Sequence, residues 1–144
     1  MCNIAETRLI VEKAAAGLAA QRATEEQIRR LGENMDAQLS CVDSDDSFDS
    51  QLYIQLDDMF HRQILEASRN NRLFRVTEDM RSQWIRVGYT ILQYDDNRHE
   101  IFKEHKAILD AIQAHDPAAA EQAMANHMSN TQQRHSSKEL PLFD

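Results

Sequence analysis

The sequence predicts an all-α protein, an antiparallel bundle of about six helices. Only 3 Gly and 2 Pro occur among 144 residues, so tight turns are few. Apolar residues recur at the three- and four-residue spacing of a helix face, and no segment alternates as a half-buried strand does. A domain of this length buries roughly 68–70% of the surface of its unfolded chain, which suffices for one core.

The first half of the chain contains three of the expected helices. Residues 3–21 place their apolar side chains on one helical face. A Thr24-x-x-Gln capping box then predicts that a second helix begins at Glu25. Residues 42–50 are polar and acidic, which indicates a loop, and a third helix follows over residues 50–68.

The second half contains the other three. Residues 69–72 (RNNR) interrupt the pattern, and Asn can end a helix in the left-handed conformation. Further helices are expected over residues 73–92 and 98–114. Asp116-Pro117 is a helix start, with Asp as N-cap and Pro in the first turn, so a sixth helix should cover residues 117–134.

Composition argues against nucleic-acid binding and membrane insertion by this chain. Its net charge is -8, and the basic residues are scattered rather than gathered on one face. The two cysteines, Cys2 and Cys41, form no CxxC pair and are expected to be free thiols in a reducing cytoplasm. The longest apolar stretch, residues 14–20, is too short to cross a bilayer, and no signal peptide is evident. We therefore expect a cytoplasmic protein.

The third helix carries polar residues where a core face is expected. Asp57 and His61 are one turn apart and share the inner side with Leu65. A buried carboxylate must be paired or bound to a metal, because its desolvation is costly. The pair therefore offers one oxygen and one nitrogen ligand on the same face.

Two more histidines lie on apolar faces. His105 sits among isoleucines, and His127 shares a face with Met124 and Met128. His105 lies 11 residues before Asp116 and His127 lies 11 residues after it. If the chain turns back at Asp116, both imidazoles reach the same height, roughly 16 Å from the turn at 1.5 Å per residue.

These four side chains predict a site for a divalent transition metal in a central cavity. Imidazole and carboxylate ligands suit zinc, our first choice, and also nickel, manganese or iron. A single inward His is more often a hydrogen-bonded core residue, and Asp57 with His61 alone could be a buried ion pair. Three inward histidines with one aspartate favour the metal. His99, His115 and His135 lie near helix ends or in the tail and are not assigned to the site.

The chain resembles the FadR C-terminal domain family, the ligand-binding domain of many GntR-type transcription regulators. The segments that carry the resemblance are ETRLIVEKAAAGLAAQRAT (6–24), DDMFHRQILEASRNNRLF (57–74), EHKAILDAI (104–112) and DPAAAEQAMANH (116–127). Residues 136–144 are expected to form a flexible tail, because chain ends that are not tied down are usually poorly ordered. The resemblance implies an effector-binding domain over residues 1–135. It also implies a homodimer, and DNA binding only through a winged helix-turn-helix domain absent from this chain.

In the metal-binding branch of that family, one Asp and three His hold a divalent metal. The matching positions are Asp57, His61, His105 and His127. The family's effectors are small organic acids, which implies that this chain senses a carboxylate. Family members often place an Arg at the start of the first helix, which favours Arg8 as a second ligand-binding group.

Arg8 and Arg81 both fall on apolar helix faces. Each could extend its charged end to solvent, as Arg commonly does, or hold the carboxylate of a ligand with its guanidinium. The sequence does not decide between these readings for Arg81. Both are retained as candidate ligand-binding residues.

Two other functions remain open. A metalloenzyme could use the same four ligands, but the sequence shows no further inward Glu or His as general base and no nucleophile with a base, so we expect a protein that is not an enzyme. A metal-free helical interaction module is the other alternative. Elemental analysis and turnover of organic acids separate these possibilities.

Overall fold

The computed structural model describes residues 3–94 and 97–136, and all regular structure within them is helical. The helices are α1 (Asn3–Arg22), α2 (Glu25–Val42), α3 (Ser50–Ala67), α4 (Asn71–Tyr94), α5 (Arg98–Gln113) and α6 (Pro117–Ser136), with a short 3-10 helix, η1 (Asp45–Ser47), before α3. The predicted all-α bundle of six helices is therefore confirmed.

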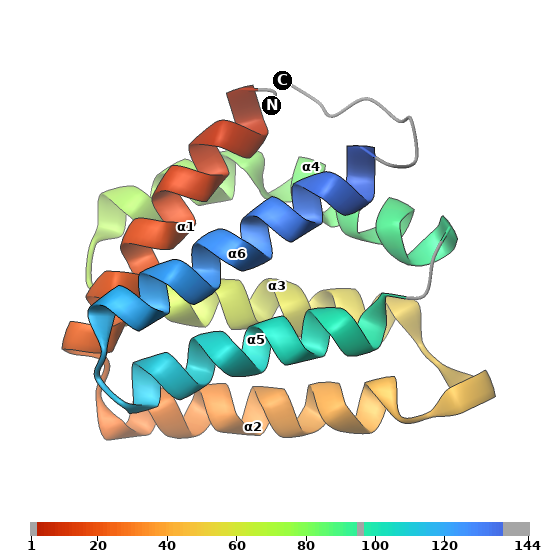
Figure 1. Ribbon diagram of the computed structural model, residues 1–144, viewed down its shortest axis with the longest axis horizontal. Helices are drawn as coiled ribbons and strands as arrows, with labels where there is room; N and C mark the ends of the chain where they lie inside the picture. The colour runs from red at the N-terminus through yellow and green to blue at the C-terminus, as the bar shows by residue number, and fades with distance from the viewer. Residues whose placement is uncertain (1–2, 95–96, 137–144) are drawn as a thin grey trace.

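The six helices surround a core to which α1 is central (Figure 1). Helices α2, α3 and α5 run along the long axis of the molecule, and α2 packs against both of the others. Helices α1 and α6 lie side by side and run diagonally across this set. Helix α4 packs against α3. Helices α3, α5 and α6 all contact α1, so these three helices share the interior with it.

The core at the contact of α1 and α6 is built from small side chains. Ala15, Ala16 and Ala19 are fully buried on α1, opposite Ala120 and Met124 of α6. Small residues let two helix backbones approach closely.

Helix ends follow the expected chemistry, with one correction. Thr24 and Gln27 form the predicted capping box. The side chain of Asn70 does not end α3. Its oxygen accepts hydrogen bonds from the backbone N–H groups of Arg72 and Leu73 and so starts α4, while Arg69 takes the left-handed conformation with φ 56°. Helix α4 therefore begins at Asn71, two residues earlier than predicted.

The acidic segment between α2 and α3 is more ordered than a loop. Helix α2 continues to Val42, and the 3-10 turn Asp45–Ser47 follows. Asp49 caps α3, because its side chain accepts a hydrogen bond from the backbone N–H of Leu52.

Residues 137–144, most of the predicted tail, lie outside the described residues, and Ser136 is the last residue of α6. Among the described helices, none combines the length and the apolar character that a bilayer span requires.

Candidate metal centre

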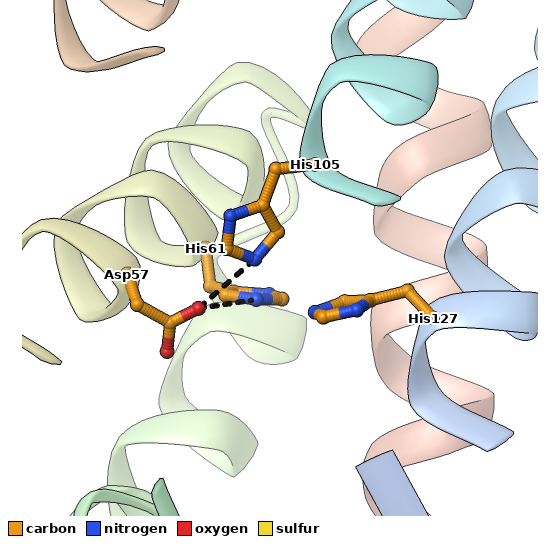
Figure 2. A group of neighbouring side chains, drawn as sticks. All are labelled: Asp57, His61, His105 and His127. Atoms are coloured by element: carbon orange, nitrogen blue, oxygen red, sulfur yellow. Dashed lines mark ion pairs between the residues drawn. The ribbon is translucent and has the colours of Figure 1, made fainter. Parts of the chain in front are cut away.

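Four side chains from three helices converge in the interior (Figure 2). Asp57 and His61 project from α3, His105 from α5 and His127 from α6. One ligand atom from each lies within 4.8 Å of the others. The three histidines are buried, at 3%, 0% and 3% exposure, whereas the side chain of Asp57 keeps 31% of its surface. The four residues predicted as metal ligands are thus neighbours, and Asp57 is the most accessible of them.

The hairpin of α5 and α6 brings two of the histidines together. His115 takes the left-handed conformation with φ 53° and reverses the chain, and the Asp116 side chain accepts a hydrogen bond from the backbone N–H of Ala119. The rings of His105 and His127 then meet edge to face, with centroids 4.7 Å apart. The equal spacing on either side of Asp116 therefore predicted their proximity correctly.

Each histidine donates its Nδ1–H to an acceptor outside the cluster. The acceptors are Glu12 for His61 (3.1 Å), Gln38 for His105 (2.7 Å) and Glu104 for His127 (2.7 Å). A neutral imidazole has one N–H and one lone pair, so whenever one of these rings is neutral, its bond through Nδ1 leaves the Nε2 lone pair facing the cluster. Metal-binding histidines in proteins are usually held in this way, which fixes the tautomer and the ring orientation.

The tautomer of His105 is set by a chain of amides that begins at the backbone. Asn34 donates its Nδ2–H to the carbonyl of Leu56, so its Oδ1 faces Gln38. Gln38 donates Nε2–H to that oxygen at 2.6 Å, which turns its own Oε1 toward His105. His105 must then carry its proton on Nδ1.

The other nitrogen of His105 consequently lies in an unfavourable environment. Its Nε2 is 3.0 Å from Oδ1 of Asp57, and no hydrogen-bond partner among the described residues completes it. A lone pair and a carboxylate oxygen at this distance repel each other unless a cation lies between them. The arrangement fits a bound metal ion.

Protonation differs among the three histidines. Burial lowers the pKa of His105, and burial lowers the pKa of His127 to about 4, so both rings are neutral at pH 7. Burial would also lower the pKa of His61, but the carboxylates of Glu12 and Asp57 raise it to about 9. Without a metal, the cluster therefore holds one proton on His61.

The sequence analysis missed the carboxylates behind the histidines. Glu12 is fully buried, and its two oxygens contact Arg8 at 3.3 Å and His61 at 3.1 Å. The expectation that no further inward Glu exists was therefore wrong. The signal was present in the sequence, because Glu12 lies one turn before Ala16, within the small-residue face of α1.

Glu104 is the second missed carboxylate. Besides His127 it accepts hydrogen bonds from Asn130 and Arg134. Burial would raise the pKa of Glu104, but the hydrogen bonds from His127 and Arg134 lower it to about 2. The signal was again present in the sequence, because Glu104 lies one turn before the buried Ile108 and next to His105.

The two predicted ligand-binding arginines lie in different environments. Arg8 is 11% exposed, lies 4.6 Å above the ring of Trp84 and lines the cavity beside Asp57 and His61. Arg81 binds Asp58 through three hydrogen bonds of 2.8 to 3.0 Å, and its side chain is 42% exposed. Arg8 thus lies beside the cluster, paired with Glu12, whereas Arg81 is paired with Asp58 and partly exposed.

The remaining histidines lie outside the cluster. His99 is exposed, 3.7 Å from Asp43. His115 donates its Nδ1–H to the carbonyl of Ala20 at 2.9 Å. His135 is buried near the end of α6, and the group of potential ligands found among the described residues does not include it.

The architecture and the sequence both match known proteins. The model of the FCD domain matches residues 3–130. This chain belongs to the FCD domain family. The family resemblance drawn from the sequence is thereby confirmed.

The relatives are transcription regulators. The chain is 27% identical over 128 residues to the HTH-type transcriptional repressor NanR of Enterobacter sp. (strain 638), covering 87% of this chain and 47% of that protein. It is 27% identical over 133 residues to NanR of Escherichia coli (strain K12), covering 90% of this chain and 48% of that protein. The chain thus spans about half the length of these relatives.

A solved structure shares the fold. The Streptococcus agalactiae GntR structure superposes with a TM-score of 0.75 at 25% identity, over 93% of this chain and 57% of that chain.

Proposed function

We propose that residues 1–135 form a metal-dependent sensor of a small organic acid within a GntR-type transcription regulator. One observation carries this proposal. Three buried histidines are each held at Nδ1 by an outer acceptor, and their Nε2 atoms converge with Oδ1 of Asp57. Histidines that only fill the core would have no reason to direct their Nε2 atoms toward one point.

The ligand atoms that these four residues offer favour a divalent transition metal. Three imidazole nitrogens and one carboxylate oxygen suit zinc first, with nickel, manganese and iron as alternatives. Asp57, His61, His105 and His127 would hold it. When bound, the metal supplies a positive centre to which the carboxylate of an effector can bind.

Charge favours an acid as the effector. A divalent metal with one aspartate and three neutral histidines keeps a charge of about +1 in a buried site, where screening by water is weak. The guanidinium of Arg8 lies in the same cavity and adds a second anchor for an anion. Arg81 contributes from the lining of the same cavity, where Asp58 already holds it.

The engagement of the outer carboxylates argues against an enzyme. A general base needs an oxygen that a substrate or water can reach. Glu12 is 0% exposed, and its oxygens are taken by Arg8 and His61. Glu104 is bound by His127, Asn130 and Arg134. Both carboxylates therefore serve to position other groups.

The relatives suggest how sensing is used. NanR is a helix-turn-helix repressor about twice as long as this chain, so we place DNA binding in a winged helix-turn-helix domain outside these 144 residues. We expect a cytoplasmic homodimer, because repressors of this kind contact two half-sites of an operator. With its net charge of -8, this chain alone should not bind DNA.

Elemental analysis and thermal unfolding test the metal. The purified domain should bind one divalent metal ion, and zinc at 100 times its dissociation constant should add about 2.7 kcal/mol of stability. The double variant His105→Ala/His127→Ala should bind none, whereas His99→Ala, which changes an exposed histidine, should bind like the wild type. Full metal content in the double variant would place the site elsewhere.

Calorimetry with organic acids tests the sensor. Zinc-loaded domain should bind small carboxylates, and the chelator-treated domain should bind them far more weakly. Turnover of any of these acids would favour the metalloenzyme instead, and absence of both metal and acid binding would favour a helical interaction module.

A further inference from the structure

The cavity beside the metal centre has two arms that share one wall. The residues that line both arms are Arg8, Ile54, Asp57, His61, Trp84 and Gly88. Asp57 and His61 are the two candidate metal ligands that line both arms. Trp84 also lines both arms, and the guanidinium of Arg8 lies above its ring. Gly88 allows α4 to approach α3 here, because a Cβ atom at this position would lie 2.8 Å from Cδ1 of Ile54.

Charged side chains line the first arm. Beyond the shared wall they form two ion pairs, Arg81 with Asp58 at 2.8 Å and Arg62 with Glu78 at 2.8 Å. The charged groups that this arm adds to the shared wall are thus already paired with one another.

The second arm is apolar. Beyond the shared wall it is lined by Tyr53, Val87, Ile91, Leu92, Ile101 and Met128, together with His127 and Thr131. The protons of its two hydroxyl groups are already donated, by Tyr53 to the carbonyl of Arg98 and by Thr131 to the carbonyl of His127, so both oxygens can only accept. Among the described residues that line this arm, the charged side chains are those of the shared wall.

We infer that the effector is an organic acid with an apolar side chain, which occupies the second arm while the acid group lies at the metal and Arg8. This inference rests on the proposed function and narrows it. A second ligand carboxylate would find no positively charged partner in the second arm beyond the shared wall, and a ligand hydroxyl would exchange its hydration for at most an acceptor oxygen of Tyr53 or Thr131. A hydrocarbon, in contrast, gains from burial against these apolar side chains.

Two ligands of equal size test this directly. 2-Hydroxybutanoate and glycerate share the 2-hydroxy acid head and differ only in a terminal methyl or hydroxyl group. Each enantiomer of both is titrated into zinc-loaded domain and followed by calorimetry and by the fluorescence of Trp84, the single tryptophan of the chain. 2-Hydroxybutanoate should bind about tenfold more tightly, because burial of its terminal methyl group is favourable, whereas the glycerate hydroxyl loses its hydration in an arm lined mainly by apolar side chains. Equal or tighter binding of glycerate would overturn the inference.

A matched pair of variants assigns the effect to the second arm. Val87→Thr keeps the shape of the side chain and places a hydroxyl group in the arm. It should reduce the preference for 2-hydroxybutanoate at least threefold, because glycerate gains a partner. Val76→Thr makes the same change on an exposed face of α4 and should leave the preference unchanged. An unchanged preference in Val87→Thr would show that the side chain lies elsewhere.

The outcomes separate the inference from the proposed function. If the zinc-loaded domain binds neither acid nor malate, which carries a second carboxylate, the sensor proposal fails and the inference with it. If malate or glycerate binds most tightly, the sensor proposal stands and the apolar side chain is wrong.

Discussion

Nε2 of His105 lies 3.0 Å from Oδ1 of Asp57, while Nδ1 of the same ring donates its proton to Gln38 at 2.7 Å. Because Nδ1 carries the proton in its hydrogen bond to Gln38, the atom that lies against Asp57 is an unprotonated nitrogen. Because Gln38 is oriented by Asn34, and Asn34 by the carbonyl of Leu56, the His105 proton cannot move to the side of Asp57 without breaking a buried hydrogen bond. The pair thus presents two electron donors to one point, as two ligands of a metal would.

Removal of the Gln38 acceptor should weaken metal binding. In Gln38→Leu the ring of His105 loses its fixed orientation and tautomer, and affinity for zinc should fall about 10- to 100-fold. Competition with a chromophoric chelator measures this. Gln21→Leu, at an exposed position of α1, is the control and should bind zinc normally. Wild-type affinity in Gln38→Leu would show that the amide chain is only structural.

Metal binding should release one proton at pH 7. His61 carries that proton in the metal-free domain, because Glu12 and Asp57 raise its pKa to about 9 against the effect of burial, while burial lowers the pKa of His127 to about 4. Zinc affinity should therefore rise about tenfold per pH unit between these values. Calorimetry in buffers of different ionisation enthalpy counts the proton.

Glu12→Gln provides the matched test of that assignment. It removes the charge that raises the pKa of His61 while keeping an acceptor for its Nδ1–H. Proton release at pH 7 should decrease in this variant. Release of two or more protons by the wild type would mean that His105 or His127 is also charged.

Glu104 should stabilise the metal-free domain in a pH-dependent manner. Burial would raise its pKa, but His127 and Arg134 lower it to about 2, below the ordinary value of 4.5. A depressed pKa stabilises the folded state above the unfolded pKa, and this contribution is lost as the pH falls from about 5 to 2. Glu104→Gln should lower the free energy of unfolding by about 1.5–3 kcal/mol at pH 7 and by little at pH 2.

Urea denaturation at a series of pH values measures that difference. The control is Glu100→Gln, one turn earlier on α5, whose side chain is 64% exposed and lies 3.6 Å from Lys103. It should change stability by less than about 0.5 kcal/mol. A pH-independent loss in Glu104→Gln would indicate packing rather than charge.

Arg8 and Arg81 should differ in their effect on the effector. Arg8→Ala should weaken binding of an organic acid by about 1.5–3 kcal/mol, roughly 10- to 150-fold, without loss of zinc, because it removes a charged hydrogen bond in a buried cavity. Arg81→Ala should cost about tenfold or less, since Arg81 is committed to Asp58 and partly exposed. Calorimetry measures the affinity of each variant for the acid, and metal analysis measures its zinc content. Undiminished affinity in Arg8→Ala would show that Arg8 is not a second anchor for the effector.

The sequence by itself determined the helices and the four candidate ligands. Capping residues such as Thr24 and Asp116 act within one turn, and inward positions of Asp57, His105 and His127 follow from helical periodicity, so both are local properties of the chain. The equal spacing about Asp116 even placed two histidines at one height.

Only the tertiary structure decided what surrounds those ligands. Glu12 lies 49 residues from His61 and Gln38 lies 67 residues from His105, so their pairing depends on how α1 and α2 pack against α3 and α5. The environments of Arg8 and Arg81 likewise depend on which residue of another helix each one meets, Trp84 or Asp58. Periodicity tells which side of a helix faces inward, but the crossing of two helices sets which inward side chains touch.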